Sequence, residues 1–134
     1  MRYVDSPASV SAQQLQGFFV GWPNPPSPEK HRELLEKSDF CLLAIDETTT
    51  LVVGFITAIT DHVLSAYIPL LEVLPSYQGQ GIGLELVRRM LEKLNSIYMV
   101  DLLCDPDLQP FYTRAGMQPA SGMLVRNYHQ QSGA

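Results

Sequence analysis

The chain of 134 residues contains few charged residues, few of them basic, and no long hydrophobic run. Charged residues make up 17% of it, and the 9 Lys and Arg are outnumbered by 14 Asp and Glu, which gives a formal net charge of −5. Proteins that bind a phosphate backbone need clustered Lys and Arg, so this composition argues against nucleic acid as the main partner. Because no apolar run approaches the roughly 18 residues of a membrane-spanning helix, we also expect no membrane partner.

Cysteine is scarce as well, with two residues, Cys41 and Cys104. Both lie in segments that favour strands, where cysteine acts as a small apolar side chain. The N-terminal stretch lacks the apolar segment of a signal peptide, so we expect a reducing, cytoplasmic location without a disulfide framework. No spacing of His, Cys, Asp or Glu matches a metal site, and we expect no metal.

Hydrophobic residues account for 46% of the chain, which is enough for the core of a single domain, residues 1–134. Runs of β-branched and aromatic residues predict strands, and apolar residues at helical spacing predict helices. The expected strands are residues 2–5, 40–45, 51–60, 63–74, 97–104 and 122–128. The expected helices are residues 9–19, 27–38, a segment that starts at Gly83, and 107–116.

Two of these segments carry more detailed expectations. Residues 63–74 are nearly all apolar, which predicts one long strand buried on both faces. Residues 27–38 begin with a serine N-cap and a proline in the first turn, and we place His31 on the solvated face of this helix. His62, in a turn, and His129, near the C-terminus, are also expected at the surface.

Residues 78–83, QGQGIG, join an apolar run to an amphipathic one. Each glycine weakens regular structure by roughly 0.5–1 kcal/mol relative to alanine, so three at alternate positions call for a reason. The free N–H groups at a helix start, together with the helix dipole, bind anions, and glycine lets a pyrophosphate approach them. The spacing matches neither the dinucleotide pattern G-x-G-x-x-G nor a P-loop.

The spacing of residues 78–83 is Q/R-x-x-G-x-G, and it resembles the acetyl-CoA loop of the GNAT (GCN5-related N-acetyltransferase) superfamily. Residues 105–117 resemble the second motif of that superfamily, N-x-x-A-x-x-x-Y-x-x-x-G-F, with Tyr112 at the matching position. Met117 replaces the phenylalanine and Asp105 the asparagine. The resemblance covers nearly the whole chain and implies an α/β GNAT fold. That fold is a mixed, mostly antiparallel sheet of about six or seven strands, splayed at the cofactor site and flanked by about four helices.

The resemblance implies an N-acetyltransferase that transfers an acetyl group from acetyl-CoA to a primary amine by direct attack in a ternary complex. A small molecule, a peptide and a protein all remain open as the acceptor. The alternative is an acetyl-CoA-binding sensor without efficient catalysis. The cofactor-binding positions that the resemblance implies are Leu71, Val73, Gln78, Gly79, Gln80, Gly81, Ile82, Gly83, Leu84, Asp105 and Tyr112.

Four of these positions have more specific implied roles. In the superfamily the pantetheine arm pairs with the free edge of a splayed strand, here through the backbone of Leu71 and Val73. The N–H of Val73 would also hold the developing oxyanion. Tyr112 is the implied acid that protonates the leaving thiolate, against the alternative of a half-buried aromatic with no chemical role. Asp105 either accepts a hydrogen bond from the cofactor arm or, as we favour, caps the helix that carries Tyr112.

The general base stays open between Glu72, Asp101 and a chain of water molecules. Glu72 lies beside the cofactor strand, but strand alternation points its side chain to the face opposite Leu71 and Val73 unless a bulge intervenes. Other members of the superfamily have a glutamate at the position of Tyr67. The alternative role for Glu72 is a hydrogen bond to a neighbouring strand or loop.

Residues 20–28 contain four prolines, which predicts an ordered loop. The resemblance implies that the acceptor amine binds beside the loop between the first two helices, here residues 18–28. Trp22 is a candidate pocket wall in this loop, or a plug against the sheet, whereas Phe18 and Phe19 are expected in the core. The apolar closing strand at 122–128 is able to pair across the axis of a homodimer. The sequence does not indicate which amine is the acceptor.

Overall fold

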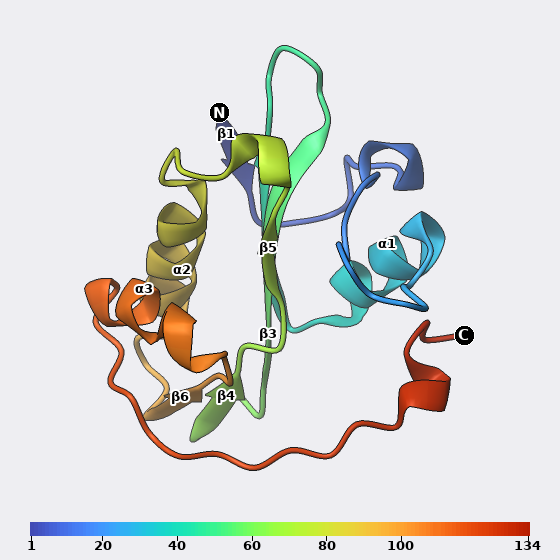
Figure 1. The fold of residues 1–134 in the computed structure, drawn as a ribbon. Helices are drawn as coiled ribbons and strands as arrows, with labels where there is room; N and C mark the ends of the chain where they lie inside the picture. Colours follow the sequence, from blue (N-terminus) through green and yellow to red (C-terminus); the bar gives the residue numbers. More distant parts are fainter.

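Six strands form one sheet in the computed structural model, which describes residues 1–134 (Figure 1). The strands are β1 (Arg2–Val4), β2 (Phe40–Ile45), β3 (Val52–Thr60), β4 (Ser65–Tyr67), β5 (Leu71–Val73) and β6 (Met99–Asp101). Their order is β1-β2-β3-β4-β6, and β5 lies beside β3. Every pair is antiparallel except β4 and β6, which are parallel. The expected mixed, mostly antiparallel sheet is confirmed.

Three α-helices cover the two faces of this sheet. They are α1 (Pro28–Lys37), α2 (Ile82–Lys93) and α3 (Gln109–Arg114). Figure 1 shows α1 on one face, and α2 and α3 on the other. As expected, α1 begins at a serine cap, where the Ser27 side chain accepts a hydrogen bond from the Lys30 N–H (3.1 Å). None of the helices is long and apolar enough to cross a bilayer.

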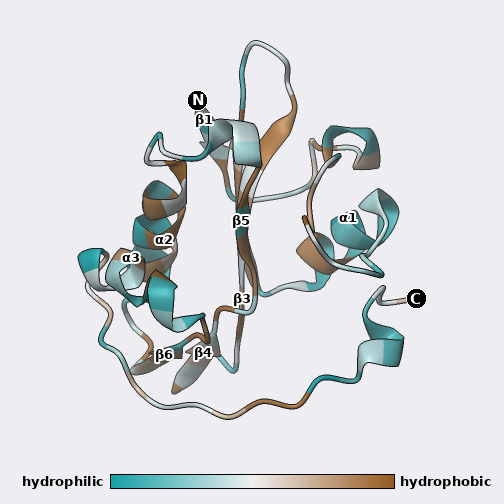
Figure 2. Cartoon of the chain, viewed as in Figure 1, coloured by the Kyte–Doolittle hydropathy of each residue, from teal (hydrophilic) through white to brown (hydrophobic).

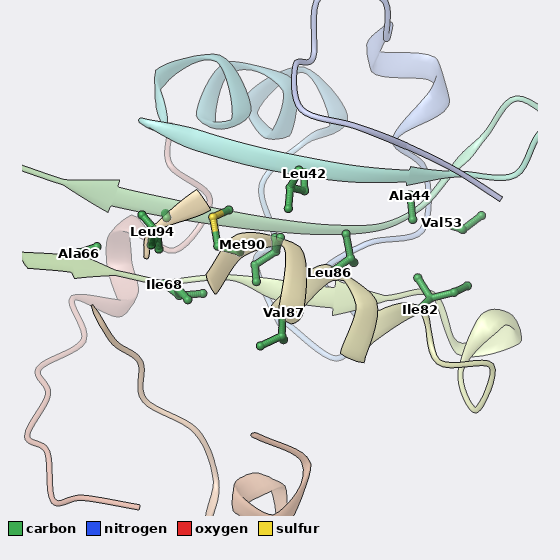
Figure 3. Close-up of a cluster of buried hydrophobic side chains, with 12 residues drawn as sticks. Leu42, Ala44, Val53, Ala66, Ile68, Ile82, Leu86, Val87, Met90 and Leu94 are labelled. Atoms are coloured by element: carbon green, nitrogen blue, oxygen red, sulfur yellow. The ribbon is translucent and has the colours of Figure 1, made fainter. Parts of the chain in front are cut away.

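The central strand β3 is buried on both faces and separates two hydrophobic clusters. One cluster lies between the sheet and α2, where Leu86, Val87 and Met90 are fully buried (Figure 3). The other lies between the sheet and α1 and includes Leu35 and Phe55. The near-continuous apolar sequence of β3 follows from this position between two layers.

The helix expected at residues 9–19 does not form, and its place is taken by a single 3-10 turn, Ala12–Gln14. Gly17 (φ +88°) and Phe19 (φ +62°) adopt the left-handed backbone conformation, which a right-handed helix cannot include. The prediction of a helix here was therefore wrong.

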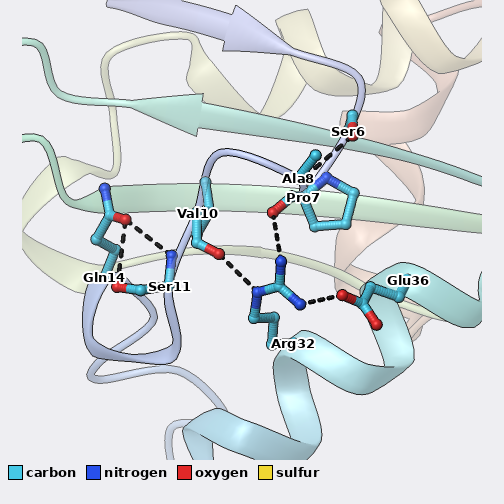
Figure 4. Close-up of polar contacts among 8 residues, drawn as sticks. All are labelled: Ser6, Pro7, Ala8, Val10, Ser11, Gln14, Arg32 and Glu36. Carbon is cyan, nitrogen blue, oxygen red and sulfur yellow. Dashed lines mark hydrogen bonds and ion pairs between the residues drawn. The ribbon is translucent and has the colours of Figure 1, made fainter.

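This N-terminal segment is instead fastened to α1 by one arginine (Figure 4). The guanidinium of Arg32 donates to the carbonyl oxygens of Val10 (2.6 Å) and Pro7 (3.2 Å), and it is also paired with Glu36. A planar guanidinium can satisfy several acceptors at once, so one side chain orders an irregular segment.

The long buried strand expected at residues 63–74 is two short strands, and its first residues form an exposed turn. Val63 and Leu64 are 78% and 52% exposed. The carboxylate of Asp61 accepts the N–H groups of Val63, Leu64 and Ser65 and so closes the turn. These bonds hold the Asp61 pKa at about 2.

The C-terminal part also differs from the expectation. The strand predicted at 97–104 is confined to β6, so Cys104 lies beyond it, half-buried and, like the buried Cys41, a free thiol. The strand predicted at 122–128 does not form, because no strand of this chain lies beside it. Residues 117–127 are an extended tail that passes below the sheet towards α1 (Figure 1).

Candidate active site

One extra residue separates β4 from β5. Ile59 of β3 lies opposite Tyr67, whereas Ile56, three residues earlier, lies opposite Leu71, four residues later. The segment that runs from β4 to β5 therefore contains one residue more than the stretch of β3 opposite it. The extra residue forms a β-bulge at residues 68–70. The bulge precedes Glu72 and does not change the direction of that side chain relative to its neighbours in β5.

The bulge opens the sheet. β4 pairs with β6, and the Ile68 N–H still reaches the carbonyl oxygen of Asp101 (2.9 Å). Beyond this point β5 pairs with β3 alone. A cleft of about 570 Å³ lies beside the unpaired edge of β5, and among its lining residues are Trp22, Glu72, Gln78, Asp105 and Tyr112.

Backbone groups of β5 face this cleft. The Thr57 N–H donates to the Leu70 carbonyl (3.1 Å), and the Leu74 N–H donates to the Val53 carbonyl (2.8 Å). Since the direction of backbone groups alternates along an antiparallel strand, the N–H and C=O groups of Leu71 and Val73 point away from β3. The predicted cofactor-binding backbone positions, Leu71 and Val73, thus lie on a strand edge that pairs with no other strand. On this edge the Val73 carbonyl oxygen accepts a hydrogen bond from Gln78 Nε2 (3.0 Å).

The glycine-rich turn leads from β5 into α2. Gly79 (φ +80°) and Gly81 (φ +83°) have left-handed backbones, and a Cβ added at either would meet no heavy atom within 4 Å. Gly81 is the N-cap of α2, and no side chain caps this helix end. The N–H groups of residues 82–84 are therefore free and directed outward, as an anion site requires.

The third glycine of the turn has a different role. Gly83 lies inside the first turn of α2, and a Cβ there would come within 3.3 Å of Phe111 Cζ. Gly83 therefore permits the close packing of α3 on α2. This contact fixes the helix that carries Tyr112 beside the cleft.

Tyr112 lies on α3 and lines the cleft together with Cys104. Burial and, to a smaller extent, the neighbouring Cys104 together raise the pKa of the Tyr112 phenol to about 12. The phenol therefore keeps its proton at neutral pH and is available as a donor.

Glu72 fastens a loop on the other side of the sheet. Leu71 and Val73 pack towards α2, whereas Glu72 points to the opposite face, as strand alternation predicts. Its two carboxylate oxygens accept the N–H groups of Phe19 (2.8 Å) and Val20 (3.2 Å). The expected hydrogen bond to a loop is thus present, and it stabilises the left-handed backbone of Phe19.

His31 lies inside the protein, and its predicted position on a solvated helix face was wrong. It is 1% exposed, and its ring centroid lies 4.3 Å from that of Phe55 and 5.0 Å from that of Phe19. Neither ring nitrogen has a hydrogen-bond partner, and burial lowers the His31 pKa to about 4. The spacing of His31 to Leu35, one helical turn away on the buried face, was the sequence signal for this position.

Trp22, in the proline-rich loop, and Asp105 both line the cleft, whereas Asp101 does not. Trp22 is 39% exposed at the cleft and packs on Phe19, with 4.9 Å between their ring centroids. Asp105 occupies the N-cap position of the 3-10 turn before α3, but its side chain makes no capping hydrogen bond. Asp101 lines a second cavity, which shares Cys104 and Tyr112 with the cleft, and does not line the cleft itself. No group of three or more His, Cys, Asp or Glu could hold a metal ion.

The chain matches the Acetyltransferase (GNAT) family over residues 9–117. It resembles the crystal structure of a Deinococcus radiodurans protein assigned as an acetyltransferase, with 43% identity and a TM-score of 0.95 over 99% of this chain and 92% of that one. It also resembles a GNAT family acetyltransferase from Streptococcus pneumoniae, with 29% identity and a TM-score of 0.75 over 94% of this chain and 97% of that one.

Two relatives extend these similarities to plants and algae. A segment of 66 residues is 44% identical to GCN5-related N-acetyltransferase 3, chloroplastic, of Arabidopsis thaliana, and it covers 48% of this chain and 28% of that protein. The uncharacterized N-acetyltransferase ycf52 of Porphyra purpurea is 26% identical over 120 residues, 85% of this chain and 68% of that protein. The matched segment thus spans under a third of the Arabidopsis protein.

Proposed function

Because the chain belongs to the GNAT family of acetyltransferases and is thereby an acyltransferase, we propose that its donor is acetyl-CoA and that its acceptor is a primary amine of a small molecule, a peptide or a protein. The observation that carries this proposal is the free edge of β5 beside the cleft, which is followed in the chain by a glycine-rich turn and an uncapped helix start. We propose that residues 1–134 act as one domain.

The donor has two chemically different parts, and each suits one part of the cleft. A pyrophosphate suits the free N–H groups at the start of α2, because Gly79 and Gly81 leave the space before them open. An arm with amide groups suits the edge of β5, where it would add to the sheet as a further strand through Leu71 and Val73. Gln78, Gln80, Ile82, Gly83 and Leu84 complete the proposed donor site, with Asp105 at the opposite wall.

Acetyl transfer forms a C–N bond, breaks the C–S bond and moves one proton from the amine to the sulfur. In our proposal the Val73 N–H donates to the thioester carbonyl oxygen as negative charge develops there. Tyr112 supplies a proton to the departing thiolate, which its protonated phenol is suited to do. Glu72 takes up the amine proton through a water molecule, on the carboxylate lone pairs that the loop leaves free.

Glu72 is favoured over Asp101 as the base because only Glu72 lines the cleft. Its carboxylate also lies on the face of the sheet that carries Phe19 and Trp22, where we place the acceptor. A single residue would then both shape the acceptor side and receive the proton.

The test is release of free thiol from acetyl-CoA across a library of amines, polyamines and peptides. Tyr112→Phe should lower kcat by about 10² or more, while the affinity for acetyl-CoA stays unchanged. Tyr3→Phe, a tyrosine of β1 that does not line the cleft, is the matched control. If no amine is acetylated, or if Tyr112→Phe retains full kcat, the proposed activity or the proposed proton donor is wrong.

A further inference from the structure

The glycine-rich turn before α2, residues 78–81, is fastened at its ends and is loose between them. None of the N–H groups of residues 79–81 donates a backbone hydrogen bond within the chain. At the far end the Glu85 N–H donates to the Gly81 carbonyl (3.0 Å), which begins the hydrogen bonding of α2. Two of the four residues are glycines with left-handed backbones, so the turn does little to restrict its own conformation. Its shape therefore depends on what fixes the two ends.

The near end is fixed by a tyrosine. Tyr77 is the last residue of the 3-10 turn Pro75–Tyr77 and directly precedes the glycine-rich turn. Its ring packs against the hydrophobic cluster between the sheet and α2, and its hydroxyl donates to Asp46 Oδ2 (2.5 Å). This hydrogen bond lowers the pKa of the Asp46 carboxyl below its usual value, so the acceptor is charged at neutral pH. A hydrogen bond to a charged acceptor is stronger than one between neutral groups.

Asp46 is itself held in place by the β2–β3 turn, residues 46–51. The Thr48 N–H donates to Asp46 Oδ1 (2.9 Å), and the Thr50 N–H donates to the Asp46 carbonyl oxygen (2.7 Å). Figure 1 shows this turn at the same end of the sheet as the 3-10 turn that carries Tyr77. Figure 2 shows mostly hydrophilic to neutral colour on the β2–β3 turn, so its hydrogen bonds rather than apolar burial order it. The partner of Tyr77 is thus a fixed point.

The far end is fixed by the seating of α2 on the sheet. Gly54 of β3 lies under the first turns of this helix, and a Cβ there would come within 3.3 Å of Ile82 Cγ2 and 3.2 Å of Leu86 Cδ1. The lack of a side chain at Gly54 lets α2 start close against β3. Tyr77, Asp46 and Gly54 all lie outside the lining of the cleft. The groups that fix the glycine-rich turn are therefore separate from those that face a ligand.

We propose that Tyr77 and Asp46 are positioning residues for the diphosphate of the donor, because their hydrogen bond holds the glycine-rich turn in its binding conformation before any donor arrives. This inference rests on the proposed function, since it needs a donor that carries a diphosphate. A site ordered in advance loses less conformational freedom on binding, so loss of the bond should weaken the affinity and leave the chemical step unchanged. The amide arm of the donor pairs with β5 in our proposal and should not depend on this bond.

The test compares two donors that differ in the diphosphate. S-acetylpantetheine has the thioester and the amide arm of acetyl-CoA and lacks the diphosphate. Tyr77→Phe keeps the ring and removes the hydroxyl, and it should raise the KM for acetyl-CoA and the calorimetric Kd for coenzyme A about tenfold with kcat unchanged. It should leave kcat/KM for S-acetylpantetheine at the wild-type value. Tyr98→Phe, at a tyrosine that is 84% exposed, is the matched control and should change neither donor.

A second variant tests the hydrogen bond itself. Asp46→Ala should raise the Kd for coenzyme A by a similar factor, and adding Tyr77→Phe to it should have no further effect, because the two residues act through one bond. Unchanged coenzyme A affinity in Tyr77→Phe, or an equal loss with S-acetylpantetheine, would overturn the positioning role alone. A wild-type protein that binds no coenzyme A would instead refute the proposed donor, and the positioning role with it.

Discussion

Protonation of His31 should destabilise the fold at mildly acidic pH. The ring is buried against Phe19 and Phe55, and no partner accepts a hydrogen from either nitrogen. The charged form would have to be desolvated there without compensation. The folded protein therefore holds His31 neutral, with a pKa of about 4 against an ordinary value of 6.5.

The sign and size of the effect follow from linkage. Because the unfolded chain binds the proton more readily than the folded one, the full free energy of unfolding is present above about pH 6.5 and decreases as the pH falls towards 4. The difference between the two pKa values corresponds to roughly 3 kcal/mol in all, of which about 2 kcal/mol is lost between pH 7.5 and pH 5. Asp61, with a pKa of about 2, contributes stability that is lost only below pH 4 and so outside this window.

The assay is denaturant unfolding at about pH 7.5 and about pH 5, with the free energy extrapolated to water. His31→Leu, similar in volume and not titratable, should remove most of the difference between the two pH values. It should not lower stability at neutral pH, since the leucine leaves no unpartnered nitrogens. His62→Gln, at an exposed histidine, should keep the wild-type difference. If His31→Leu retains the full pH dependence, the explanation is wrong.

Three further predictions concern the cleft. Gly81→Ala should weaken coenzyme A binding at least tenfold by calorimetry, because a left-handed alanine costs about 1–2 kcal/mol and its Cβ crowds the proposed anion site. The control is Gly116→Ala, at φ +101° with equally open space, which should leave coenzyme A binding unchanged. Glu72→Gln should lower kcat/KM for the amine about 10²-fold and leave coenzyme A affinity unchanged, and unchanged amine kinetics would exclude Glu72 from the acceptor side. Coenzyme A at 100 times its Kd should add about 2.7 kcal/mol to the free energy of unfolding, and the absence of a thermal shift would contradict the donor site.

The elements that the sequence predicts well are those encoded by neighbouring residues. The start of α1 is encoded by two adjacent residues, the N-cap Ser27 and the first helical residue Pro28. The turn before α2 is encoded by Gly79 and Gly81. Strands β2 and β3 are almost entirely apolar because both faces of the sheet are covered. In each case the signal lies within the segment itself.

The features that the sequence does not predict depend on distant contacts. The helix expected at 9–19 fails because Glu72, more than fifty positions later in the chain, holds Phe19 in a left-handed turn. The strand expected at 122–128 has the right side chains and lacks a neighbour in its own chain. The bulge at 68–70 is a matter of register between two strands, which apolar spacing does not encode.

The bulge has a consequence for how this cleft can be gained or lost in evolution. Its opening depends on the number of residues between β4 and β5, so loss of a single codon at residues 68–70 would let the strand run on regularly beside β6. Such an in-frame deletion would abolish the proposed donor site and leave every glycine, tyrosine and carboxylate of the cleft in the sequence. A relative with all of the motif residues and one residue fewer in this stretch should therefore fold and bind no donor.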